Sequence, residues 1–192
     1  MTHPATLHPR LADVLDLAAT ARAELLAVVD PLDMDTLSRR PGTDEWSPAE
    51  VLEHLRIVEL SVVKLLRKLV PTARANGLGA ETDTSSIRHL LDDRHQLYGD
   101  AKLEAPEMVR PVNVDPHAVR AGLEESRRAL IEAVALADGL ALGGVTFPHP
   151  RLGTLNLYEW ILFIPLHERR HLRQIRRALD SIPLAPISAP RA

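Results

Sequence analysis

The stretch SPAEVLEHLRIVELSVVKLLRKLV, residues 47–70, decides the fold class, because it has the pattern of one long amphipathic helix with a defined start. Ser47 is a favourable N-cap, Pro48 suits the first helical position, and Glu50 completes a capping box. Apolar residues then recur at helical spacing, which places one face of the helix in a core. Pro71 follows directly, and we expect it to end the helix.

Three further segments show the same helical period. They cover about residues 9–29, 115–139 and 156–180. The second of these opens with another cap-plus-proline pair, Asp115-Pro116, and the third opens with a capping box of Asn156 and Glu159. Inside the long connection over residues 71–114, the pattern of residues 85–103 predicts a shorter helix. No segment has a convincing strand pattern.

The spacing of these helices along the chain predicts how they are connected. Short links join the first helix to the second and the third to the fourth, whereas a long crossover joins the middle two. This arrangement is typical of an all-α four-helix bundle. We expect one such domain over residues 10–180, a flexible N-terminus over 1–9 and a proline-rich tail over 181–192.

Composition sets limits on the function. The chain has 192 residues, which is enough for one buried core, and only 3% of them are aromatic, so aliphatic side chains must fill that core. The net charge of −3 gives no general attraction to nucleic acid or to anionic membranes. The chain has no cysteine, so a bound metal must use nitrogen and oxygen ligands. The N-terminus has no signal-peptide pattern and no stretch is long enough to span a bilayer; we therefore expect a cytoplasmic protein without nucleic-acid or membrane partners.

A metal-ligand motif lies in the last predicted helix. His167-Glu168-Arg169-Arg170-His171 matches H-E-x-x-H, the zinc-protease motif in which two histidines bind the ion and the glutamate is the general base. At about 100° per residue the two histidines lie about 40° apart on the apolar face of the helix. We expect the arginines of this helix to occupy the opposite face: Arg169, Arg170, Arg173, Arg176 and Arg177.

The protease interpretation of this motif is weak. Zinc proteases usually take a third ligand, Glu or His, from further along the chain, but the 21 residues after His171 contain neither. Glu168 has two other interpretations. It is either a hydrogen-bond acceptor that orients a ligand histidine, or the ion-pair partner of an arginine from the helix over 47–70 or 115–139. We favour the ion pair. Glu59 could face a metal-bound water, but pairing with a basic side chain is again favoured.

His54 is a candidate for a third ligand. It lies on the apolar side of the helix over 47–70, where it is either a boundary residue or a ligand that faces the histidine pair. Three neutral imidazoles would leave one metal position open, which is the pattern of catalytic sites. His149, before the last helix, is either a substrate contact or a turn residue between two prolines. We expect the remaining histidines to lie outside the site: His3, His8, His89, His95 and His117.

With these residues identified, the sequence resembles the DinB/YfiT-like family of metal-binding four-helix bundles. Two blocks carry the resemblance, EWSPAEVLEHL at residues 45–55 and HPRLGTLNLYEWILFIPLHERRHLRQI at residues 149–175. The resemblance implies that the metal ligands are His54, His167 and His171. It places Glu168 at a variable position of the family motif. Pro165 departs from the family pattern, and it either kinks the last helix or is tolerated there.

The resemblance also implies a function. Members of the wider superfamily include metal-dependent thiol S-transferases and isomerases, and hydrolases of unknown substrate. We therefore expect an enzyme that binds one divalent transition metal, zinc or nickel, with or without a low-molecular-weight thiol. We expect it to act on a small molecule, either as a hydrolase or as a thiol-dependent S-transferase or isomerase. Trp46 and His149 are candidates for cofactor binding, and Glu59 and Glu168 for catalysis. The alternative is a non-catalytic metal-binding bundle, and in either case we expect a homodimer.

Overall fold

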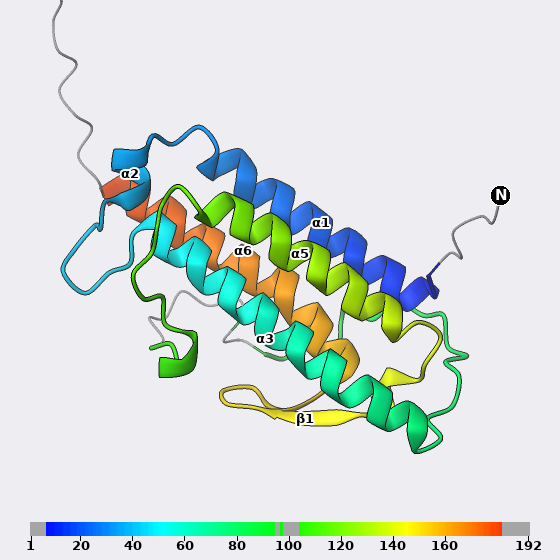
Figure 1. Ribbon diagram of the computed structural model, residues 1–192. Coiled ribbons are helices and arrows are strands. Elements are labelled where there is room, and N and C mark those ends of the chain that lie inside the picture. Colours follow the sequence, from blue (N-terminus) through cyan, green and yellow to red (C-terminus); the bar gives the residue numbers. More distant parts are fainter. Residues whose placement is uncertain (1–6, 95–96, 98–103, 182–192) are drawn as a thin grey trace, which may run out of the picture.

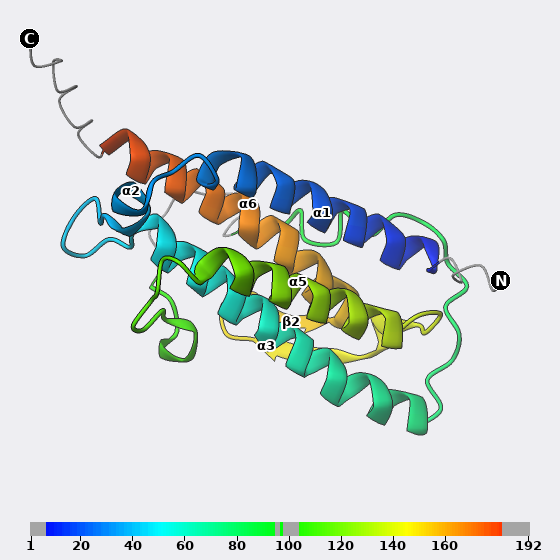
Figure 2. The ribbon, with the colours of Figure 1, turned by 45° about the horizontal axis from the view of Figure 1, so that its top comes forward.

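Four long helices lie side by side in the computed structural model, which describes residues 7–94, 97 and 104–181 (Figures 1 and 2). These helices are α1 (Pro9–Val29), α3 (Pro48–Ala75), α5 (Val119–Leu136) and α6 (Leu157–Ser181). The predicted four-helix bundle is therefore confirmed. Within the described ranges, none of the helices is long and apolar enough to cross a bilayer. Apart from residues 7–9 and 181, the predicted N-terminal segment and proline-rich tail lie outside the described residues.

The chain direction explains the long connection in the middle of the sequence. Helix α1 packs against α6, and α3 packs against both α5 and α6. Helices α3 and α5 run in the same direction, so the chain must return along the bundle between them (Figure 1). The short helix α2 (Met34–Ser38) lies in the link between α1 and α3, and the 3₁₀ turn η1 (Glu107–Val109) lies in the crossover.

Three predicted helix ends differ from the structure, and one of them is the end of α5, which lies at Leu136 and not at residue 139. Helix α3 continues past Pro71 to Ala75, because a proline so near the C-terminus removes one backbone donor and leaves the remaining turn intact. Helix α5 begins at Val119, since residues 115–118 form a turn before it. The capping boxes of Ser47 and Asn156 are both present.

The expectation that no strand forms was wrong. After the 3₁₀ turn η2 (Leu142–Gly144), β1 (Thr146–His149) pairs antiparallel with β2 (Gly153–Asn156), with Thr146 opposite Asn156 and His149 opposite Gly153. Gly153 has φ of +77°, a backbone conformation that favours glycine where the hairpin turn ends. Both strands are four residues long and mostly exposed, so the sequence lacks the alternating pattern of a half-buried strand.

The helix predicted over residues 85–103 is also wrong in its first half. Residues 87–94 form consecutive turns, in which backbone amides bond to the carbonyl three residues earlier. Ile87 and Leu91 of this segment point into the core although the backbone is not helical there. Leu97 is helical, and the rest of the predicted helix lies outside the described residues.

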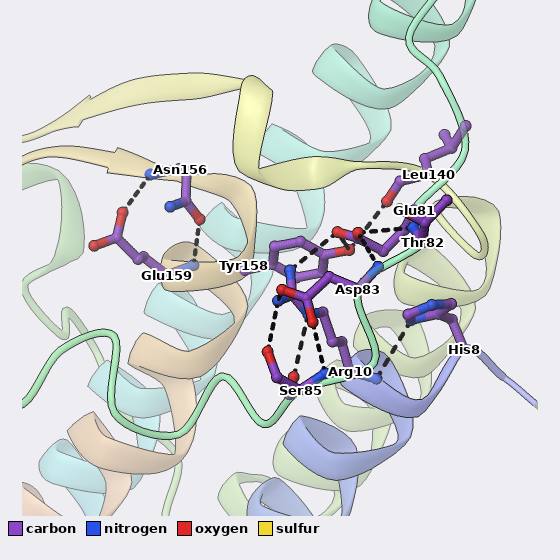
Figure 3. A network of polar contacts seen from close by, with 10 residues as sticks. All are labelled: His8, Arg10, Glu81, Thr82, Asp83, Ser85, Leu140, Asn156, Tyr158 and Glu159. Carbon is purple, nitrogen blue, oxygen red and sulfur yellow. Dashed lines mark hydrogen bonds and ion pairs between the residues drawn. The ribbon is translucent and has the colours of Figure 1, made fainter.

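A polar network attaches the start of the crossover to the bundle (Figure 3). Glu81 accepts hydrogen bonds from the Tyr158 hydroxyl (2.8 Å) and from Arg10 Nη1 (3.1 Å), and the guanidinium of Arg10 also contacts Asp83 and Ser85. Burial and the Glu81 carboxylate raise the pKa of Tyr158, which keeps the hydroxyl protonated. The network therefore fixes α1, the crossover and α6 relative to one another.

Two apolar clusters fill the bundle, one along each half of its length. The larger cluster surrounds Leu66, Leu130 and Ile161, and the smaller surrounds Leu25 and Leu172. Between them, each of the four long helices contributes a buried polar or charged residue. These residues are Arg22, Glu59, Ser126 and Glu168.

Candidate metal centre

The three predicted histidine ligands lie together where α3 faces α6. His54 comes from the second turn of α3, and His167 and His171 come from successive turns of α6. One ring nitrogen from each histidine lies within 4.8 Å of the other two. Among the described residues, this is the one group of three or more histidine or acidic side chains that is close enough to hold an ion.

Hydrogen bonds from the outer nitrogens fix the orientation of two of the rings. His54 Nδ1 lies 2.7 Å from the carbonyl oxygen of Val109 in η1, and a carbonyl can only accept, so Nδ1 carries the proton. His171 Nδ1 likewise lies 2.8 Å from the side-chain oxygen of Gln174. In both neutral rings Nε2 is therefore the unprotonated nitrogen. Metal-binding histidines commonly donate their other ring N–H in this way.

The contact between His167 and His171 tests whether the residues suit an ion. Their Nε2 atoms are 3.1 Å apart. Two nitrogens bound to one zinc ion at about 2.0–2.1 Å with tetrahedral angles lie about 3.3 Å from each other. With His171 Nε2 unprotonated, a proton on His167 Nε2 forms a hydrogen bond at this distance, and a metal ion in place of that proton would need the two nitrogens to move only slightly apart. The three histidines therefore fit a divalent transition metal.

The electrostatic environment keeps the imidazoles neutral. Burial, reinforced by His54, lowers the pKa of His171 from 6.5 to about 3. Burial also lowers the pKa of His54, and it lowers the pKa of His167 strongly, helped by the other two histidines and Arg170. Because only a neutral imidazole binds a metal, the histidine cluster is ready to coordinate at neutral pH.

A cavity of about 950 Å³ opens beside the histidines. It is lined by the three histidines and by both candidate cofactor-binding residues, Trp46 and His149. The Trp46 ring lies 5.0 Å from the His54 ring, and Trp160 and Phe163 form an apolar wall next to His149. The cavity is large enough for a small molecule.

The arginines of α6 do not all face away from the histidines. Arg169 pairs with Glu24 on the outside of the bundle, as expected. Arg170 and Arg177 instead line the cavity, so their predicted position opposite the histidines was wrong. Both are within about a third of a turn of the His171 direction, and a long arginine side chain can reach around the helix over that angle.

Neither candidate catalytic carboxylate lines this cavity. Glu168 Oε1 accepts hydrogen bonds from Arg22 Nε (2.8 Å) and from Arg127 Nη2 (2.9 Å). Glu59 accepts from the same two arginines, Arg22 at 3.0 Å and Arg127 at 2.7 Å, and from Ser126. The favoured ion-pair interpretation is confirmed for both residues, although for Glu168 only Arg127 comes from an expected helix and Arg22 comes from α1. In this position neither carboxylate can reach a metal or a substrate in the cavity.

Of the histidines expected to lie outside the site, those that the structure describes lie apart from the cluster. His8 caps α1 through its ring nitrogen, and His89 and His117 are exposed. His3 and His95 lie outside the described residues. Pro165 is buried within α6, and the helix continues through it to both ligands.

Comparison with known proteins identifies the family. The profile of the DinB superfamily matches residues 17–175. The chain belongs to the DinB superfamily. It is 28% identical over 164 residues to the uncharacterized protein YuaE of Bacillus subtilis (strain 168), a match that covers 84% of this chain and 94% of YuaE. This DinB-superfamily chain is also similar to the crystal structure of TT2238, a four-helix bundle protein, with 27% identity and a TM-score of 0.57 over 87% of this chain and 98% of TT2238.

The sequence interpretation missed several residues that build the site. Arg22 and Arg127 were not recognised as the partners of Glu59 and Glu168, although each lies three residues before a buried leucine, Leu25 and Leu130. The contact of Gln174 with His171 was predictable, because residues three apart on a helix are neighbours. The carbonyl of Val109 had none, because a backbone contact across a long connection leaves no trace in the sequence.

Proposed function

We propose that this DinB-superfamily protein is a metal-dependent enzyme that binds one divalent transition-metal ion, zinc or nickel, through His54, His167 and His171. Its substrate is a small molecule that enters the adjoining cavity. The single observation that carries the proposal is the position of the three neutral imidazoles on the wall of that cavity. Three nitrogen ligands with an accessible fourth position are typical of catalytic sites, whereas structural zinc sites are closed by four protein ligands.

The residues of the chain have separate tasks in this proposal. Val109 and Gln174 hold the outer nitrogens of His54 and His171, so that the Nε2 atoms face each other. Trp160 and Phe163 form an apolar wall that shields one side of the cavity from water. A divalent ion held there acts as a Lewis acid towards a water, an oxygen or a thiol of the substrate.

Two reaction classes suit such a site, hydrolysis and thiol-dependent S-transfer or isomerisation. A thiol from a low-molecular-weight cofactor is compatible with the open position, because the chain supplies no cysteine. The zinc-protease interpretation has little support, since Glu168 would have to face the substrate as a base but pairs with Arg22 and Arg127 in the core.

Two activity assays on zinc- and nickel-loaded protein test the proposal. One measures transfer of glutathione or cysteine to chlorodinitrobenzene, and the other measures hydrolysis of nitrophenyl acetate, each against the His171→Ala variant. We expect metal-dependent turnover in at least one assay and its loss in the variant. If neither assay shows turnover and removal of the ion with a chelator unfolds the protein, the centre is a structural one and the non-catalytic bundle is the better account.

A further inference from the structure

The His149 ring has one nitrogen engaged by the backbone of the hairpin turn. Its Nδ1 lies 3.2 Å from the amide nitrogen of Arg151 and 3.1 Å from that of Leu152. An amide N–H can only donate, so Nδ1 accepts both hydrogen bonds and carries no proton. In a neutral imidazole the proton then resides on Nε2, and the turn itself fixes this tautomer.

The rest of the ring lies in the wall of the cavity. The His149 ring centroid is 5.0 Å from that of Trp160 and 4.9 Å from that of Phe163, and all three residues line the cavity beside the histidine cluster. The Phe163 ring in turn lies 4.7 Å from the ring of His167. These contacts hold His149 between two aromatic rings and allow it little freedom to rotate.

The Nε2 atom of His149 has no acceptor within the part of the chain that the structure describes, where its hydrogen bonds are the two at Nδ1. The ring lines the cavity, and its Nδ1 is held by the turn, so Nε2–H is the ring donor left for a ligand in the cavity. An unused donor that is held rigidly in a largely apolar wall favours a ligand with an atom that can accept a hydrogen bond from it.

We propose that His149 is a positioning residue whose Nε2–H donates a hydrogen bond to an oxygen acceptor of the substrate, a carbonyl or a carboxylate, beside the histidine cluster. The inference rests on the proposed function, because the acceptor belongs to a substrate only if the protein is an enzyme. It narrows the substrate class to a small molecule that combines an apolar part, which packs on Trp160 and Phe163, with such an oxygen.

Two substitutions separate the donor at Nε2 from the acceptor at Nδ1. In His149→Asn the side-chain oxygen takes the place of Nδ1 and can still accept from the turn amides, but the donor at Nε2 is lost. In His149→Gln the side-chain nitrogen reaches the position of Nε2 and preserves a donor, but the turn acceptor is lost. A role confined to the turn predicts damage in the glutamine variant only, whereas the donor role predicts loss of ligand binding in the asparagine variant.

Long-range proton–nitrogen NMR of the purified protein, with and without zinc, reads the tautomer directly. We expect His149 to be protonated at Nε2 and unprotonated at Nδ1 in both samples. Protonation at Nδ1 would overturn the inference. Because this readout needs neither metal nor activity, its failure is distinct from failure of the proposed enzyme function.

Binding of benzoate, which combines an apolar ring with a carboxylate, tests the donor in the cavity. Trp46 and Trp160 both line the cavity, so their fluorescence reports occupancy. We expect the Kd for benzoate to rise by about tenfold or more in His149→Asn and by less than about threefold in His149→Gln, because a hydrogen bond to a charged acceptor contributes about 1.5–3 kcal/mol. The same ratios should hold with and without zinc. Equal affinity in wild type and His149→Asn, equal losses in both variants, or no binding to wild type would each contradict the inference.

Discussion

Replacing Glu168 with glutamine tests the interpretation of this residue as part of a buried ion-pair cluster. The cluster joins Arg22 of α1, Glu59 of α3, Arg127 of α5 and Glu168 of α6, two cations and two anions. The Glu168 side chain is only 2% exposed. The substitution keeps the shape of the side chain but removes one negative charge, so that the core retains an uncompensated arginine.

The size of the effect follows from burial. Breaking a buried ion pair by removing one partner costs about 3–5 kcal/mol, because the remaining charge stays without water and without its partner. Burial raises the pKa of the Glu168 carboxyl despite the opposing effect of Arg127 and Arg22, so part of the cost of desolvation is already present in the wild type. We therefore expect a loss at the lower end of the range, about 3 kcal/mol at pH 7.

Urea unfolding followed by circular dichroism measures this loss, and Glu24→Gln is the matched control. Glu24 pairs with Arg169, the residue next to Glu168, with the same N···O distance of 2.9 Å as the Arg127–Glu168 pair, but the Glu24 side chain is 41% exposed. An exposed pair contributes about 0–1 kcal/mol, so Glu24→Gln should change stability little. A loss below about 1 kcal/mol in Glu168→Gln, or equal losses in the two variants, would refute the reasoning.

A second substitution shows whether the loss comes from the unpaired charge. In Arg22→Met combined with Glu168→Gln, the remaining charges are Glu59 and Arg127, which still pair at 2.7 Å. The double variant should therefore lose less stability than the sum of the two single variants. Additive losses would mean that the residues contribute independently, through packing alone.

Three further predictions concern the centre and the fold. Alanine at any one of the three ligand histidines should lower metal content sharply by elemental analysis, whereas alanine at His117, which is exposed, should leave it unchanged. The metal-free protein should lose stability as the pH falls from about 6.5 to about 3, by up to about 1.4 kcal/mol per pH unit from His171 alone. The reason is that the His171 ring takes up a proton in the unfolded protein but stays neutral in the folded one. A stability that does not change with pH in urea unfolding would contradict this. Ser47→Ala should cost about 1 kcal/mol, since the Ser47 hydroxyl caps α3, and Ser47→Thr should restore most of the loss.

The starts of α1, α3 and α6 were predictable because they depend on local capping chemistry, whereas the predicted start at Asp115-Pro116 was wrong and α5 begins at Val119. The predicted bounds of α1 agree with the structure, and the capping boxes of Ser47 and Asn156 are present as expected. Helix ends were less predictable, because a terminal proline such as Pro71 removes one donor but does not force the preceding residues out of the helix. The hairpin could not be predicted, since its strands are short and exposed.

The histidine cluster was predictable because its geometry is mostly local to one helix. The i,i+4 spacing of His167 and His171 places both rings on one face, and His54 is on the apolar side of its own helix. Arg22 was not recognised as a core residue, because arginine is seldom buried unless it is paired. Arg22 occupies a core position by its spacing from Leu25, and its charge is tolerated there only because carboxylates from two other helices reach it.

The central claim is that one divalent ion is bound by His54, His167 and His171. Crystals of protein saturated with zinc or nickel, measured at the absorption edge of the metal, test it most directly. We predict one anomalous peak per chain, in contact with a nitrogen of each of the three rings at about 2.0–2.1 Å for zinc. A peak bound by other residues, or three histidine rings without a peak at saturating metal, would contradict the claim.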